Sequence, residues 1–155
     1  MGPVTAEFER CVAETIDVSY FVATTSGSMA ILMALIAAGV GPGDEVIVPN
    51  RTWIATAHAP LLLGANPVLI DVRSVNMREV TRIADRNGVI VVEDAAQAFG
   101  SRNADGWIGT QSFARCFSLS IAKISFHEPG WICRDAGRKS SIAGSNRCGH
   151  MASAT

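Results

Sequence analysis

The stretch Val89–Gly100, VIVVEDAAQAFG, decides the fold class of this chain. It opens with β-branched side chains, which are typical of a strand that is buried on both faces. Two acids, Glu93 and Asp94, follow at once, and a charge at the end of a buried strand is costly unless it meets a cation or a donor. Ligands of open α/β sheets bind at this end of the strands. The stretch therefore predicts a central strand whose final carboxylate is either functional or structural.

Helix-like and strand-like segments alternate on both sides of this strand. Helical spacing and end signals predict helices at Val4–Ile16, Met29–Ala38, Thr52–Leu63 and Asn76–Asn87. Apolar runs predict strands at Tyr20–Thr24, Glu45–Pro49, Pro67–Val72 and Val89–Glu93, and shorter signals follow at Ala95–Phe99 and Ser112–Leu119. Continuous apolar strands separated by helices indicate an α/β fold, with a mostly parallel sheet and helices on both faces.

Composition excludes several classes of protein. The chain has 155 residues, 48% hydrophobic and 17% charged, with a net charge of −1. This balance gives no electrostatic reason to expect nucleic acid or an anionic membrane as a partner. The charged fraction lies below the roughly 25% that is usual in soluble domains. The sequence therefore contains more apolar side chains than one short domain of this size can bury.

The sequence also indicates where the protein works. No secretory signal is visible at the N-terminus, and the longest apolar stretch, Met29–Ala38, is about half of a membrane span. The four cysteines show no CxxC spacing, and His58, His127 and His150 are scattered, so we expect no metal site. These features predict a cytoplasmic protein that does not contact a membrane.

Three further positions have both an ordinary and a chemical interpretation. Ser26, Gly27 and Ser28 precede a predicted helix, where they can form either a simple N-cap or a phosphate-binding turn. Trp53 follows a predicted strand and can be a core aromatic or a surface on which a planar ring stacks. Lys123 lies in the apolar stretch FSLSIAK, where it is either solvated or an amine nucleophile of lowered pKa.

Taken together, a phosphate turn, a stacking aromatic, a strand-end acid and an apolar lysine match the needs of pyridoxal 5′-phosphate (PLP). The motifs that carry them also resemble one family, the DegT/DnrJ/EryC1/StrS sugar aminotransferases, of the aspartate-aminotransferase-like type I fold. The matching stretches are TSGSMA at 25–30, GPGDEVIVP at 41–49, TWIAT at 52–56, GANPV at 64–68, VEDAAQAFG at 92–100 and FSLSIAK at 117–123.

The resemblance implies a role for each matching residue. Lys123 would hold PLP through an imine and move a proton during catalysis, and Asp94 would pair with the pyridine nitrogen. Trp53 would stack on the ring and Gln97 would lie near its phenolic oxygen. The phosphate would be bound by Gly27, Ser28 and Ser118. Lys123 and Asp94 are thus the expected catalytic residues.

The resemblance also implies an activity and its partners. Members of the family transfer an amino group, usually from glutamate, to a nucleotide-linked keto-sugar, and they work as homodimers. The sugar and the nucleotide are not encoded in any stretch that can be interpreted here. A non-catalytic PLP- or ligand-binding, regulatory relative is the alternative function. A Rossmann oxidoreductase is disfavoured because the first turn lacks GxGxxG.

The sequence departs from the family at two places. Near 74–76 a helix and a strand of the family pattern are missing, which predicts an internal deletion. Residues 125–155 lack the periodicity of helix or strand, and two interpretations stay open for this tail. It is either a disordered tail or out-of-frame translation, because a one-nucleotide shift at Phe126, with suitable synonymous codons, gives a family-like loop. We therefore expect residues 1–124 to form a partial PLP-binding large domain, with impaired activity and weakened dimer contacts.

Overall fold

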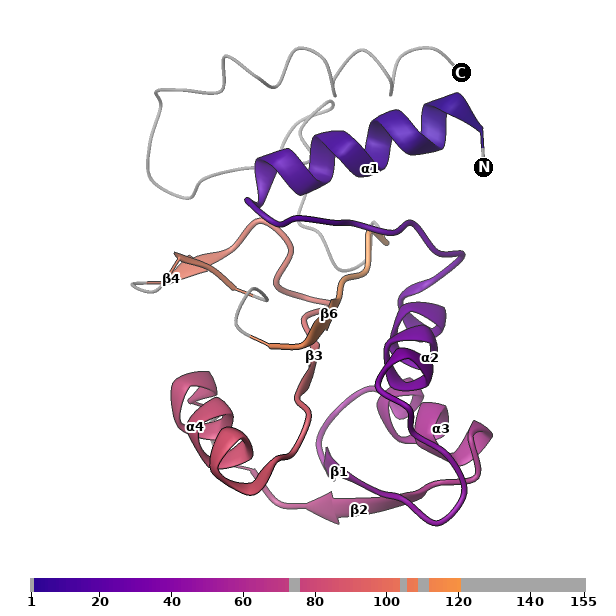
Figure 1. Cartoon of the computed structure of the whole chain (residues 1–155), viewed down its shortest axis with the longest axis vertical. Helices are drawn as coiled ribbons and strands as arrows, with labels where there is room; N and C mark the ends of the chain where they lie inside the picture. Colours follow the sequence, from indigo (N-terminus) through magenta and orange to yellow (C-terminus); the bar gives the residue numbers. More distant parts are fainter. Residues whose placement is uncertain (1, 73–75, 104–105, 109–111, 121–155) are drawn as a thin grey trace.

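The computed structural model describes residues 2–72, 76–103, 106–108 and 112–120. Its helices are α1 (Pro3–Thr15), α2 (Gly27–Ala37), α3 (Ile54–Leu62) and α4 (Met77–Asn87). Its strands are β1 (Glu45–Pro49), β2 (Asn66–Ile70), β3 (Val92–Asp94), β4 (Arg102–Asn103), β5 (Gly106–Trp107) and β6 (Ala114–Cys116). Helices and strands alternate from α2 to β3, as Figure 1 shows, which confirms the predicted α/β class.

The described strands form pairs and not one continuous ladder. β1 pairs in parallel with β2, from Glu45 opposite Asn66 to Pro49 opposite Ile70. β3 pairs in parallel with β6, and β4 with β5 forms a short antiparallel hairpin. The parallel pairing is thus present twice, and α3 is the crossover that joins β1 to β2. Strands β2 and β3, which follow one another along the chain, belong to different pairs.

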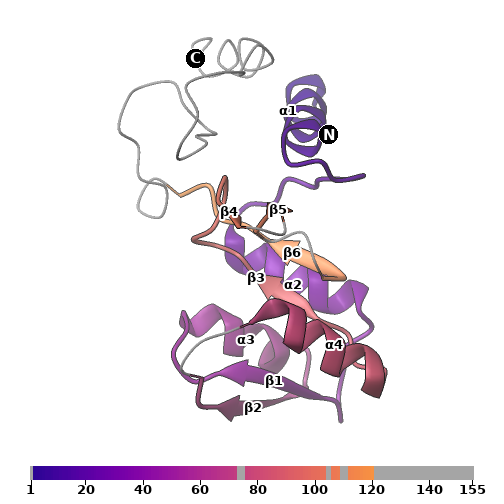
Figure 2. The same ribbon diagram turned by 90° about the vertical axis from the view of Figure 1, so that its left-hand side faces the viewer.

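Helices lie on both sides of the β3–β6 pair. In Figures 1 and 2, α4 lies on one side of this pair and α2 on the other. α2 also packs against α3, and together they form a core of small and branched side chains with β6: Ile31, Ala34, Leu35, Ala59 and Cys116. This core fixes the start of α2 and the start of α3 relative to the end of β3.

The four predicted helices are present, with ends shifted by one or two residues at most positions. α2 begins at Gly27 because Ser26 caps it, with its Oγ accepting a hydrogen bond from the Met29 amide at 3.2 Å. α4 ends at Asn87 because Gly88 adopts the left-handed conformation, at φ 64°, that terminates many helices. These are local signals, which is why the sequence locates these ends well.

Some predicted strands are wrong or shorter than expected. Tyr20–Thr24 forms no ladder, and its Ala23 amide donates instead to the Glu9 carboxylate at 2.7 Å. The strand predicted at Val89–Glu93 is observed at Val92–Asp94, where it pairs with Ala114–Cys116. Ala95–Phe99 forms turns, through an Ala98-to-Ala95 backbone bond, and the β4–β5 hairpin was not predicted. The junction at 73–75 and the tail at 125–155 lie outside the described residues.

Candidate functional site

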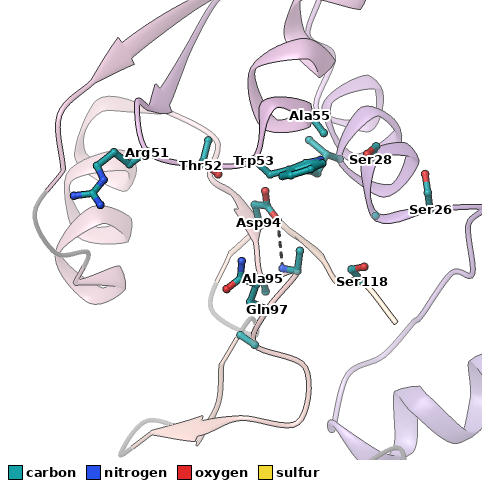
Figure 3. A pocket seen from close by; sticks show the side chains of 14 residues that line it. Ser26, Ser28, Arg51, Thr52, Trp53, Ala55, Asp94, Ala95, Gln97 and Ser118 are labelled. Atoms are coloured by element: carbon teal, nitrogen blue, oxygen red, sulfur yellow. Dashed lines mark hydrogen bonds between the residues drawn. The ribbon is translucent and has the colours of Figure 1, made fainter. Parts of the chain in front are cut away.

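A cavity of about 850 Å³ opens where several chain elements end or begin. Its walls come from the start of α2, the loop between β1 and α3, the turn after β3, and the segment after β6. This volume is within the range of ordinary cofactor and ligand pockets. Figure 3 shows Trp53 and Asp94 facing this space, with Ser28 on the α2 side. The cavity therefore lies at the carboxyl ends of strands, as the sequence predicted for ligand binding.

The α2 side of the cavity offers hydrogen-bond donors. Gly27 and Ser28 are the first residues of α2, where amide N–H groups have no acceptor within the helix. The Ser26 side chain satisfies the Met29 amide, so the N-cap interpretation of this turn is correct. It does not exclude the phosphate interpretation, because all three turn residues line the cavity and the positive end of the helix dipole favours an anion there.

Gly27 lies very close to the segment that follows β6. A Cβ atom on Gly27 would lie 3.2 Å from Ser118 Cβ and 3.5 Å from the Phe117 carbonyl oxygen. Glycine is therefore the residue that allows this close approach. Ser118 is 8% exposed and lines the cavity, so its hydroxyl and the start of α2 face the same small volume. Such a narrow polar turn suits a small anionic group such as a phosphate.

Asp94 ends β3 at the floor of the cavity, with both carboxylate oxygens hydrogen-bonded. The Thr56 hydroxyl donates to Oδ2 at 2.7 Å, and the Ala96 amide donates to Oδ1 at 3.3 Å. A carboxylate can accept about four hydrogen bonds, so acceptor sites remain for a ligand. Asp94 is thus oriented by the protein and still able to accept a bond from a cationic ring nitrogen.

Cys116 lies beside Asp94 in the β3–β6 ladder and is 2% exposed. Burial, together with the nearby Asp94 charge, raises the pKa of the Cys116 thiol to about 12. The thiol is therefore neutral at physiological pH and is not a nucleophile. It serves as a small apolar residue beneath the site.

The remaining lining residues differ in their accessibility. Trp53 is the N-cap residue of α3, and 66% of its surface is exposed, so it is not a core aromatic. Gln97 lies on the turn after β3 and is exposed. Arg51 also lines the cavity, although Figure 3 shows its guanidinium directed away from Asp94. A large flat surface is thus available for a planar ring beside the strand-end carboxylate.

The structure brings most of the predicted site residues together. Gly27, Ser28, Trp53, Asp94, Gln97 and Ser118 all line this one cavity. Lys123 lies outside the described residues, so its role stays a prediction.

Sequence analysis did not single out Arg51, Thr52 or Thr56. The two threonines stand in the predicted helix Thr52–Leu63, but the helix begins only at Ile54, so helical spacing does not explain their contact. Within the described ranges, no helix is long and apolar enough to cross a membrane. No group of three or more histidine, cysteine or acidic side chains in the same ranges could hold a metal ion.

Comparisons with known proteins agree on one family. The sequence model of the DegT/DnrJ/EryC1/StrS aminotransferase family matches residues 1–76 and 73–135, which is well over half of the chain. Among curated proteins, Protein MosB of Rhizobium meliloti is 35% identical over 146 residues, covering 75% of this chain and 29% of MosB.

Solved structures give the same result. DesV of S. venezuelae, in complex with a ketimine intermediate, is 31% identical with a TM-score of 0.74, covering 79% of this chain and 41% of DesV. NtdA of Bacillus subtilis, with bound cofactor PMP, is 27% identical with a TM-score of 0.67, covering 72% of this chain and 32% of NtdA. This chain therefore spans less than half the length of these relatives. It is a member of the DegT/DnrJ/EryC1/StrS aminotransferase family.

Proposed function

We propose that this chain is the cofactor-binding part of a PLP-dependent aminotransferase. The observation that carries the proposal is the convergence of a phosphate turn, an exposed tryptophan and an oriented carboxylate on one cavity. Membership of an aminotransferase family and the PMP bound to NtdA support the same cofactor. When bound, PLP supplies an aldehyde that forms imines with amines and a ring that acts as an electron sink.

The residues present fit such a group. The amides of Gly27 and Ser28 and the Ser118 hydroxyl would hold the phosphate, since these donors face one narrow volume that a Cβ on Gly27 would fill. Trp53 would stack on the pyridine ring through its exposed indole. The phosphate would thus be held by neutral donors at a helix start and the ring by dispersion.

The remaining assignments concern Asp94, Gln97 and Lys123. Asp94 would accept a hydrogen bond from the protonated ring nitrogen and keep that proton on the ring, and Gln97 would lie near the phenolic oxygen. Lys123 is proposed as the amine that attaches the cofactor and moves the proton of the reacting carbon. Removing water from around these groups would strengthen each of these electrostatic interactions.

We propose glutamate as amino donor and a nucleotide-linked keto-sugar as acceptor. This assignment rests on the family, whose members the sequence resembles from Phe8 to Lys123. A non-catalytic ligand-binding role is the competing outcome, and the following experiment separates the two.

The purified chain is incubated with PLP, its absorbance spectrum is recorded, and borohydride is added. We expect a cofactor band, and covalent attachment of the cofactor to the peptide that contains Lys123, located by mass spectrometry. Lys123→Ala should abolish attachment. Glutamate should then convert the cofactor to its amine form. A band that does not respond to glutamate supports the non-catalytic alternative, and absence of any band in the starting chain contradicts the proposal.

We further propose that a second copy covers the outer face of α2 and α3. Three exposed large apolar side chains line a groove between the two helices: Met29, Ile54 and Leu62. The groove, of about 260 Å³, shares Ser28 and Trp53 with the cofactor cavity, so a covering chain would also close the site. Leu62, at 74% exposed, is expected to lie in this contact.

Sedimentation equilibrium tests this assembly. Leu62→Lys is expected to weaken self-association, whereas Val4→Lys, at a 67% exposed position on α1, is the matched control. Equal association of both variants with the starting chain would contradict the proposed contact.

The internal deletion and the shifted tail also remain proposals. The two family matches meet at residues 73–76, and β2 and β3 belong to separate pairs, which supports a missing strand between them. The second family match ends at residue 135, inside the tail that is proposed to begin at 125. Sequencing the locus from independent isolates tests both ideas, and an intact frame with no aminotransferase-like sequence downstream would overturn the shifted frame.

A further inference from the structure

The Asp94 carboxylate is connected to a pair of threonine hydroxyls that no role yet explains. Thr56 Oγ1 lies 2.7 Å from Asp94 Oδ2, a contact between residues 38 positions apart in the sequence. Thr52 Oγ1 lies 3.2 Å from Thr56 Oγ1, and Thr52 is in the loop just before α3. The three groups form a series of hydrogen bonds that runs from the loop after β1 to the end of β3.

The number of available protons determines which hydroxyl donates and which accepts in this series of hydrogen bonds. An ionised carboxylate can only accept, so the single proton of the Thr56 hydroxyl is used toward Asp94. The bond between the two threonines then requires Thr52 to be the donor and Thr56 the acceptor. Both hydroxyl dipoles consequently point toward Asp94, and aligned hydrogen bonds of this kind strengthen one another.

The position of Trp53 links these hydrogen bonds to the cofactor cavity. Trp53 lies between the two threonines in sequence, as the residue that precedes the first turn of α3. The start of α3 would therefore provide the stacking surface with one side chain and orient the acid with two others. A shift of this helix start would move both the ring contact and the carboxylate.

We propose that Thr56 is a positioning residue, which fixes the Asp94 carboxylate where a ring nitrogen would meet it, and that Thr52 orients the Thr56 hydroxyl. The inference rests on the proposed function, because it is the PLP ring that gives the fixed carboxylate its use. Without the Thr56 hydroxyl, Oδ2 loses its described protein donor, and Asp94 keeps the longer Ala96 contact to Oδ1.

The first arm of the test needs no cofactor. A double-mutant cycle of Thr56→Val and Asp94→Ala is measured by urea unfolding of the full chain. We expect the two substitutions to be non-additive, because each removes the same hydrogen bond. Additive effects would overturn the proposal whatever the cofactor does. Thr56→Ala replaces Thr56→Val in the cycle if the valine variant does not fold. Thr56→Ser keeps the hydroxyl and should unfold as the starting chain does.

The second arm measures the dissociation constant for PLP by quenching of tryptophan fluorescence. Thr56→Val is expected to weaken binding about tenfold, as for loss of a hydrogen bond to a charged group, and Thr52→Val to weaken it less. Thr56→Ser should restore the affinity. Thr15→Val is the matched control, because the Thr15 hydroxyl bonds only the Cys11 carbonyl of its own helix among the described contacts.

The two arms separate the inference from the function on which it rests. Coupling in the cycle, together with loss and serine rescue of PLP affinity, supports the positioning role. Coupling with unchanged PLP affinity in Thr56→Val overturns it. A starting chain that binds no PLP overturns the proposed function, while coupling in the cycle still supports the pairing of Thr56 with Asp94.

Discussion

Replacing Gly27 with alanine is expected to weaken PLP binding while leaving the protein folded. The new Cβ would lie 3.2 Å from Ser118 Cβ, so Ser118 must move by a few tenths of an ångström. Gly27 has no left-handed backbone angle, so alanine is not strained at this position. The substitution thus tests the polar turn and not the fold.

The opposing contributions to stability are of similar size. Replacing glycine by alanine at a compatible position stabilises by about 0.4–1 kcal/mol, mainly by restricting the unfolded chain. Overpacking of a tight contact typically costs about 1–3 kcal/mol. We therefore expect a net loss of unfolding free energy between about 0 and about 2.6 kcal/mol.

We expect Gly27→Ala to remove a larger fraction of the free energy of phosphate binding than of the free energy of unfolding. A displaced Ser118 and a methyl group at the turn would remove at least one charge-assisted hydrogen bond, worth about 1.5–3 kcal/mol. Such a loss corresponds to a fall in PLP affinity of about tenfold or more. Fluorescence titration with PLP measures this affinity, and urea unfolding followed by circular dichroism measures stability.

Gly41→Ala is the matched control. Gly41 has no atom within 4 Å of an added Cβ and no left-handed backbone angle, and it lies in the loop before β1. Both PLP affinity and stability should be nearly unchanged. If Gly27→Ala binds PLP as tightly as Gly41→Ala does, the start of α2 is not the phosphate site and the reasoning fails.

Three further outcomes follow from the structure. Trp53→Ala should lower PLP affinity in a fluorescence-independent absorbance titration, and Trp53→Phe should retain most of it, with little change in urea midpoint because Trp53 is 66% exposed. Burial, together with the Asp94 charge, raises the pKa of Cys116 from 9.0 to about 12, so the folded state holds the thiol proton more tightly than the unfolded state does. The unfolding free energy should therefore fall as pH rises from about 9 toward 12. The fall should be smaller in Cys116→Ala. Leu35→Ala, in the α2–α3 core at 5% exposed, should cost about 2–5 kcal/mol in urea unfolding, whereas a similar loss for the exposed Leu62→Ala in the monomer would contradict this assignment of the core.

Local patterns in the sequence were sufficient for the helices and for several residues that line the candidate site. The α2 start follows from Ser26 and the α4 end from Gly88, each a signal confined to one turn. Asp94 was found because its charge follows an apolar strand, and Trp53 because it follows another. Residues that act at strand ends or helix starts are thus visible without knowing what packs against them.

Long-range pairings could not be predicted in the same way. β3 pairs with β6, some twenty residues later, and no pattern in VIVVED specifies that partner. Tyr20–Thr24 is rich in residues that favour strands, yet its Ala23 amide donates a hydrogen bond to the Glu9 side chain. The Thr56–Asp94 contact likewise depends on how α3 packs and not on spacing within either motif.

The described part of the cavity also shows how an anion can be held there without a facing cation. Arg51 is the one basic side chain among the described lining residues, and its guanidinium points away from Asp94. If a phosphate binds in this part of the site, as proposed, its attraction would come from amide donors, hydroxyls and the α2 dipole. Such donors act only at short range and in fixed directions, unlike a mobile charge. Selectivity then depends on the close approach of Gly27 to Ser118, so filling that space should harm binding more than neutralising Arg51 does.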